Sequence, residues 1–187
     1  MQHWDHSIST KNLTKSFGWD THDSSLQHDA QEFKRVLFEK LDESMKGTAE
    51  EGTIQRLFEG HYMNLIKCIK VDYTSTSKEP FYDLLLNIKE CRNLYDSLDK
   101  YVEMEKIQGY STEQYGFQDI QMGRLFNSFP PVLQIQLQRF EYDHMKGTTI
   151  NDRYEFPLQL DLDRDDGKYL SSEADRSVRN LYTLHRY

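Results

Sequence analysis

Two cysteines and seven histidines are the residues of this chain that could carry nucleophilic or metal chemistry. A thiol nucleophile needs a cysteine whose thiolate is stabilised by a nearby histidine, commonly at a helix N-terminus. Cys68 lies within a strand-like stretch and Cys91 follows another. We therefore predict that both are reduced and buried as small apolar residues, and we assign no catalytic residue from these patterns.

The other familiar patterns of enzyme chemistry do not occur in the sequence. The histidines show no HExxH or comparable ligand spacing, and there is no glycine-rich phosphate loop and no GxSxG elbow. We expect no metal site and no cofactor.

Polar residues at helical spacing are the remaining candidates for a site. Residues 24–47 predict a long helix, because six apolar side chains recur every three or four residues: Leu26, Ala30, Phe33, Leu37, Leu41 and Met45. Ser24 and Gln27 resemble a capping box, and Gly47 supplies a left-handed stop. The apolar stripe should face a core.

The opposite face of this helix is polar. His28, Glu32, Arg35 and Glu39 fall within roughly 60° of arc, and Asp29 lies at the edge of the apolar stripe. Periodicity alone fits a solvated face as well as a binding face, and both interpretations stay open at this point.

Length and charge limit the class of protein. With 187 residues the chain has the size of one domain, and 12 tyrosines and 10 phenylalanines argue against disorder. The net charge of -8 disfavours nucleic acid as a partner and favours a partner with a basic surface. No apolar run approaches the ~20 residues of a membrane helix, and no signal peptide is evident. We expect a cytoplasmic or nuclear protein without membrane contact.

The rest of the chain predicts short helices and then strands. A second helix is expected at 53–60 and a third at 93–105. Strands are expected at 61–73, 80–89, 129–143 and 150–163, with a further strand beginning at 181. The first two strands should form a hairpin around a loop at 74–80. A further loop is predicted at 109–123, a turn at 146–147 and a charged surface loop at 163–180. The expected fold class is α+β, with helices first and an antiparallel sheet after them.

Five sequence blocks, in order, resemble the interior of the ubiquitin-specific proteases, most of all the herpesvirus-associated branch and its plant relatives. The blocks are QHDAQEF (27–33), EGTIQRLFEG (51–60), FYDLLLNIK (81–89), PPVLQIQLQRFEYD (130–143) and INDRYEFP (150–157). The resemblance covers nearly the whole chain. It implies part of a papain-like hand: thumb helices at about 1–60, fingers at about 61–120 and part of the palm at about 121–187.

The family removes ubiquitin from proteins with a thiol-dependent Cys, His and Asp or Asn site. Its cysteine lies in a block upstream of the QHDAQEF-type helix, and its histidine lies in a block one strand beyond the position of residues 181–185. This sequence contains neither block, so the resemblance implies an interior fragment that is inactive by itself. The zinc-binding CxxC pairs of many members are also absent.

The resemblance also implies a partner, which is ubiquitin or ubiquitinated proteins. Asp29, Glu32 and Arg35 match positions that line the channel for the basic tail of ubiquitin, and Phe140 matches a palm residue that touches this tail. Two alternatives remain: a non-catalytic protein that binds ubiquitin or another partner, or a truncated gene product without a function.

Overall fold

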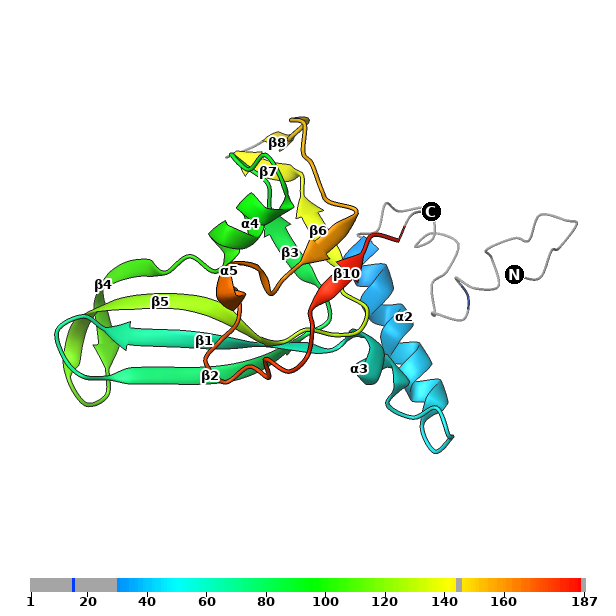
Figure 1. Cartoon of the computed structure of the whole chain (residues 1–187), viewed down its shortest axis with the longest axis horizontal. Coiled ribbons are helices and arrows are strands. Elements are labelled where there is room, and N and C mark those ends of the chain that lie inside the picture. Colours follow the sequence, from blue (N-terminus) through cyan, green and yellow to red (C-terminus); the bar gives the residue numbers. More distant parts are fainter. Residues whose placement is uncertain (1–14, 16–29, 144–145, 186–187) are drawn as a thin grey trace, which may run out of the picture. The chain divides into compact units, whose positions relative to one another are not determined.

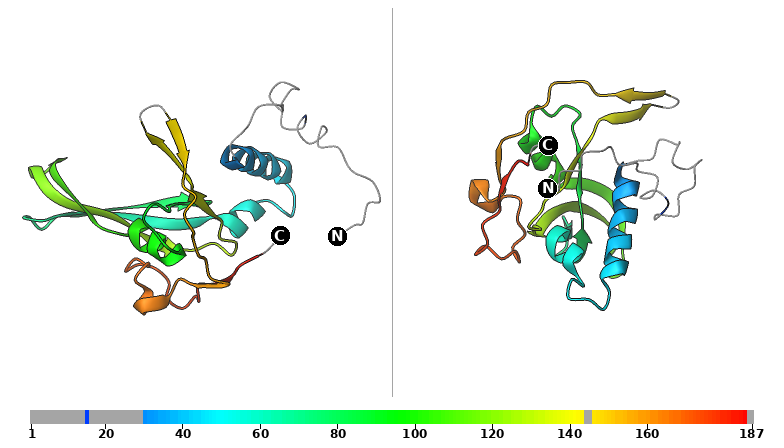
Figure 2. Two further views of the ribbon diagram at one scale, coloured as in Figure 1. Left: turned by 90° about the horizontal axis from the view of Figure 1, so that it is seen from above. Right: turned by 90° about the vertical axis from the view of Figure 1, so that its right-hand side faces the viewer.

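The computed structural model describes residue 15 and residues 30–143 and 146–185. The chain divides into two compact units, residues 1–56 and residues 57–187, with the division inside a short helix, α3 (Thr53–Phe58). Figures 1 and 2 show the ribbon from three directions.

The long helix of the first unit is α2 (Ala30–Met45). It ends as predicted: Gly47 has a left-handed φ of 72°, and the amide and hydroxyl of Thr48 both donate to the carbonyl of Met45. Phe33 and Leu37 of the apolar stripe are half-buried. The predicted start of the helix at Ser24 lies outside the described residues.

The second unit contains a four-stranded antiparallel sheet with the order β2-β1-β5-β4, which forms the long arm of Figure 1. Its strands are β1 (Gly60–Cys68), β2 (Thr74–Phe81), β4 (Glu105–Thr112) and β5 (Gly116–Ser128). The predicted strand at 61–73 is confirmed as far as residue 68. The predicted loops at 74–80 and 109–123 are wrong, because residues 74–80 belong to β2 and residues 109–123 contain half of β4 and most of β5. Most side chains of β2 are exposed to solvent, so its sequence lacks the alternation of apolar and polar residues from which a strand is predicted.

A small parallel sheet lies beside the arm. In it β3 (Leu84–Asn87) pairs with β6 (Ile135–Gln138). The predicted hairpin between 61–73 and 80–89 is therefore wrong, because β2 takes the position next to β1. Parallel pairing needs a long crossover, and here the chain passes through α4 (Leu94–Tyr101), β4 and β5 before it returns.

The core of the second unit gathers around β3 and α4. Leu84, Leu86 and Leu98 are at most 1% exposed. Asn93 caps the start of α4, since its side chain accepts a hydrogen bond from the amide of Asp96 at 3.0 Å, and the predicted helix at 93–105 is confirmed over residues 94–101. The buried hydroxyl of Ser97 donates to the carbonyl of Asn87 and accepts from Tyr154, so this polar group is satisfied.

The predicted strand at 129–143 is divided at Arg139. Beyond β6 the chain enters β7 (Phe140–Asp143), which pairs with β8 (Lys146–Thr149) in a separate hairpin. Lys146 and Gly147, which were predicted as a turn, belong to β8. The chain changes its pairing partner between β6 and β7, but the residue composition does not change there, so the sequence gives no sign of the division.

The last strands are β9 (Gln159–Asp161) and β10 (Leu181–Thr183), which pair antiparallel. They confirm a shortened form of the predicted strands at 150–163 and 181. Between them, residues 163–180 were predicted as a surface loop, but they contain the short helix α5 (Arg164–Gly167) and the fully buried Tyr169. The hydroxyl of Tyr169 donates to Asp99 at 2.7 Å, which ties this segment to α4. The fold class is α+β, as expected.

Candidate functional site

The polar face of α2 carries two of the four site residues expected from the sequence. Glu32 and Arg35 are exposed. The guanidinium of Arg35 lies 2.7 Å from the carboxylate of Glu39 one turn later, and both side chains are more than 60% exposed. Such an exposed pair contributes little stability and leaves its groups accessible to a partner. Asp29 lies outside the described residues.

Phe140, the fourth expected residue, lies in the other unit, at the start of β7. It is 62% exposed, which is unusual for a large aromatic side chain. The base of the β7–β8 hairpin is fixed by a reciprocal contact: the amide of Ile150 donates to the carbonyl of Arg139 at 2.7 Å, and the Arg139 guanidinium donates to the carbonyl of Ile150 at 3.1 Å. This clamp holds the strand that presents Phe140.

Both cysteines are free thiols and are buried, as predicted. Cys68 is 3% exposed at the end of β1, opposite Ile120 of β5. Cys91 is 8% exposed, and its thiol lies 3.5 Å from the carbonyl of Lys89. A thiolate nucleophile must reach its substrate, and neither position offers that access. Among the described residues, no group of three or more His, Cys, Asp or Glu side chains could hold a metal ion.

One imidazole cluster was not foreseen from the sequence. His61 pairs with Ser128 across β1 and β5; its Nδ1 lies 3.3 Å from the Ser128 hydroxyl, and its Nε2 lies 3.4 Å from a carboxylate oxygen of Glu59. The other Glu59 oxygen accepts from the Tyr82 hydroxyl at 2.5 Å. The order hydroxyl, imidazole, carboxylate is that of a nucleophilic relay. None of these four residues lines the apolar pocket described next, and we infer that the cluster joins the ends of β1, β2 and β5.

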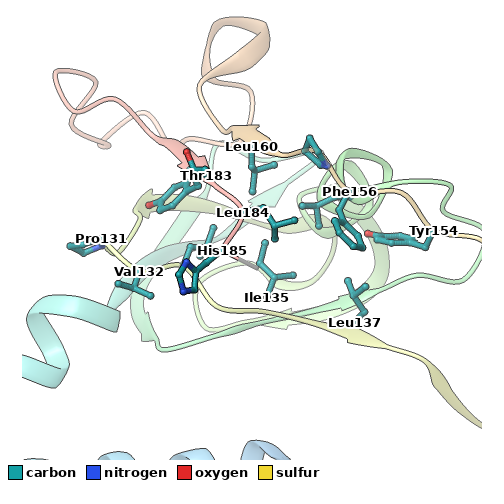
Figure 3. A pocket seen from close by; sticks show the side chains of 14 residues that line it. Pro131, Val132, Ile135, Leu137, Tyr154, Phe156, Leu160, Thr183, Leu184 and His185 are labelled. Atoms are coloured by element: carbon teal, nitrogen blue, oxygen red, sulfur yellow. The ribbon is translucent and has the colours of Figure 1, made fainter. Parts of the chain in front are cut away.

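An apolar pocket of about 650 Å³ lies in the second unit and is shown in Figure 3. Its walls come from β6, from the segment before β9, and from β10 with the residues after it. The apolar lining residues include Leu133, Ile135, Leu137, Phe156, Leu160 and Leu184. Thr183 and His185, on either side of Leu184, also line it.

The strand at 129–143 was predicted from the sequence, but the pocket was not. Within it, Leu133, Ile135 and Leu137 alternate with polar residues, and in the structure these side chains are only half-buried. Alternation indicates which face is apolar, but it does not indicate how completely the neighbouring elements cover that face. The exposure of the pocket depends on tertiary packing.

Comparison with known proteins agrees with this architecture. Residues 1–185 match the family described as "Ubiquitin carboxyl-terminal hydrolase". The chain is 65% identical over 190 residues to Ubiquitin C-terminal hydrolase 12 of Arabidopsis thaliana and 48% identical to Ubiquitin carboxyl-terminal hydrolase 7 of Drosophila melanogaster. The matches cover 99% of this chain but only 17% and 16% of those proteins. The chain thus spans about a sixth of the length of these relatives.

Solved structures show the same fold. The chain resembles a structure described as the SAGA Ubp8/Sgf11/Sus1/Sgf73 DUB module bound to ubiquitin aldehyde, with a TM-score of 0.73 and 25% identity. The match covers 86% of this chain and 37% of that one. In the described part of the present chain, no helix is long and apolar enough to cross a membrane. With a family match that runs from residue 1 to residue 185, the chain belongs to the ubiquitin carboxyl-terminal hydrolase family.

Proposed function

We propose that this chain is an interior part of the catalytic domain of a ubiquitin-specific protease, of the herpesvirus-associated branch, and that it binds ubiquitin. The observation that carries the proposal is the family match over residues 1–185, together with structural relatives whose descriptions include bound ubiquitin. Identities of 65% and 48% to hydrolase 12 and hydrolase 7 support the choice of branch.

The proposed ubiquitin-binding residues are Asp29, Glu32, Arg35 and Phe140. Glu32 and Arg35 are exposed on α2, and Phe140 is 62% exposed on β7. Carboxylates on α2 and the net charge of -8 suit the basic tail of ubiquitin. Phe140 supplies an aromatic anchor of the kind that dominates interface energies.

A titration of labelled ubiquitin with the chain tests this proposal. A contact surface of about half of a standard interface of ~1,600 Å² is consistent with weak binding, and we expect a Kd of about 10–100 μM. Phe140→Ala should weaken binding, whereas Val178→Ala, which removes an equally exposed apolar side chain from residues 163–180, should not. Glu32→Lys should weaken binding more than Glu50→Lys, a matched charge change in the turn after α2. Absence of saturable binding up to about 1 mM would contradict the proposal.

We also propose that the chain does not cleave ubiquitin conjugates by itself. Burial of Cys68 and Cys91 to 3% and 8% exposure supports this, since acyl transfer to a thiol needs an accessible thiolate with a neighbouring base. Incubation with a ubiquitin substrate that carries a fluorescent leaving group should give no turnover. Turnover that is lost in Cys68→Ala or in Cys91→Ala would show that one of these thiols is catalytic.

A further inference from the structure

Arg139 lies where the β7–β8 hairpin joins the rest of the second unit. Within residues 30–143 and 146–185, β7 and β8 pair only with each other, and a two-stranded hairpin is marginal by itself. The hairpin therefore depends on the residues that flank it. The guanidinium of Arg139 donates from one nitrogen to the carbonyl of Ile150 at 3.1 Å and to the carbonyl of Asp152 at 3.5 Å.

The carbonyls that accept from this guanidinium belong to a segment, residues 150–155, that is fixed to α4. The amide of Leu94 donates to the carbonyl of Glu155 at 3.0 Å. Tyr154 is 9% exposed, and its hydroxyl donates to Ser97 at 2.9 Å. These contacts do not involve the guanidinium, so the segment is held independently and offers it a fixed partner.

Phe140 directly follows Arg139 and is the first residue of β7. Its side chain is 62% exposed, so little packing holds the ring, and the direction of β7 sets where the ring lies. A rotation of the hairpin about residues 139 and 150 would carry the ring with it. Binding sites require their contact groups to be held within about 0.5 Å. The guanidinium can therefore control a contact of Phe140 without touching the partner.

We propose that Arg139 is a positioning residue for ubiquitin: it fixes the β7–β8 hairpin against residues 150–155 so that Phe140 meets the tail of ubiquitin. The inference rests on the proposed ubiquitin binding and adds the residue on which the Phe140 contact depends. Arginine suits this role, because its planar guanidinium presents several donors in a fixed arrangement, whereas an ammonium is a point charge on a flexible stem. Arg139→Lys should keep the charge and lose part of the orientation.

Amide hydrogen exchange measures whether the guanidinium holds the hairpin. The amide of Ile150, which donates to the carbonyl of Arg139 at 2.7 Å, should exchange at least about tenfold faster in Arg139→Ala than in the wild type, and Arg139→Lys should give an intermediate rate. Arg153→Ala is the matched control. It removes an 87% exposed arginine of the same segment together with its ion pair to Glu155, and it should leave this exchange rate unchanged.

A double-mutant cycle separates positioning from a general loss of stability. In ubiquitin titrations, Arg139→Ala should raise the Kd about tenfold and Arg139→Lys about threefold, whereas Arg153→Ala should bind as the wild type does. In a Phe140→Ala background, Arg139→Ala should change the Kd by less than about twofold, since the contact that it positions is already absent. A merely structural role would weaken binding equally in both backgrounds.

The inference is overturned if the wild type binds ubiquitin and Arg139→Ala binds equally well, or if the effects of Arg139→Ala and Phe140→Ala are additive. If Arg139→Ala does not fold, the same cycle with Arg139→Lys replaces it, and additivity again overturns the inference. A wild-type chain that does not bind ubiquitin at all contradicts the proposed function and this inference together. Normal wild-type binding without any effect at Arg139 contradicts the positioning role alone.

Discussion

Asp163 organises the end of the chain through three hydrogen bonds. Its carboxylate accepts from the amide of Asn180 at 2.6 Å, from the Asn180 side chain at 2.7 Å and from Arg179 at 3.0 Å. Burial disfavours its charged form, but the bonds from Asn180 and the charge of Arg179 outweigh this and lower the pKa of Asp163. The carboxylate thereby fixes the residue that precedes β10, one wall of the pocket.

Replacing Asp163 by Asn should destabilise the chain and change its response to acid. At neutral pH we expect the free energy of unfolding to fall by about 1–3 kcal/mol. The asparagine side chain cannot accept all three hydrogen bonds, and its NH₂ group would face other donors. A pKa that is lowered in the folded state contributes stability above the unfolded pKa, and this contribution disappears as the pH falls through the folded pKa. The wild-type protein should therefore lose more stability than Asp163→Asn below pH ~4.

Urea unfolding at neutral and acidic pH measures this difference. Asp72→Asn, an exposed carboxylate in the turn after β1, is the control and should behave as the wild type at each pH. Parallel acid profiles for wild type and Asp163→Asn would show that Asp163 does not carry the acid sensitivity.

Among the single residues, the burial of Cys68 and Cys91 could be predicted, because small apolar residues in strand-like stretches pack inside. The contacts of Asp163 and of Tyr169 could not. Both lie in a segment whose charge density resembles a solvated loop, and their partners Asn180 and Asp99 are distant from them in sequence. The composition of a segment does not indicate which of its polar and charged residues form hydrogen bonds within the fold.

The four-stranded sheet of β1, β2, β4 and β5 is the element that sequence patterns described least well. Only β1 was expected, because β2 and β4 are mostly exposed and therefore show little apolar alternation. Helix α2 from Ala30 onward and helix α4 were predicted, since an apolar stripe with a period of 3.6 is a local signal. The pairing of β6 with β3 could not be derived, because parallel partners are chosen by the tertiary fold.

Arg124 joins this sheet to α4. Its guanidinium lies 4.1 Å from the ring centroid of Tyr62 in β1 and 5.7 Å from that of Tyr101 in α4. It also donates to Asn64 at 3.0 Å and to the Tyr101 hydroxyl at 3.1 Å. Stacking and directed hydrogen bonds from one planar group depend on the shape of arginine.

Arg124→Ala should therefore destabilise the chain by about 1–3 kcal/mol, the sum of a partly desolvated cation–π contact and lost hydrogen bonds. Arg124→Lys should recover less than half of this loss, because an ammonium has no planar face to stack on the two tyrosine rings while it donates its hydrogen bonds. Urea unfolding measures this loss as a shift of the midpoint, provided that the dependence of the unfolding free energy on urea concentration stays the same. Arg153→Ala, whose side chain is 87% exposed, is the control. Full rescue by lysine would show that only the charge matters.

The molecule combines a well-packed centre with apolar surface that its described elements leave open. Phe126 is fully buried and lies 5.6 Å from the ring of Tyr101 and 4.5 Å from that of Phe129. By contrast, Phe156, which lines the pocket, is 54% exposed, and Leu158 and Leu181 are 59% and 47% exposed. Each large apolar side chain left in water forgoes up to ~1.5–3 kcal/mol.

We expect the isolated chain to be folded but marginal, with apolar surface that binds a hydrophobic dye. A domain is stable by only ~5–15 kcal/mol, so several uncovered side chains remove a large part of that stability, and thermal unfolding should occur below ~60 °C. Phe156→Ser should reduce dye fluorescence, because the dye loses a wall of the pocket, whereas Phe117→Ser, which alters a 79% exposed residue at the start of β5, should change it less. Fluorescence titration and a thermal melt measure both quantities. A monomer that melts cooperatively above ~60 °C without binding dye would show that the elements described here close the core by themselves.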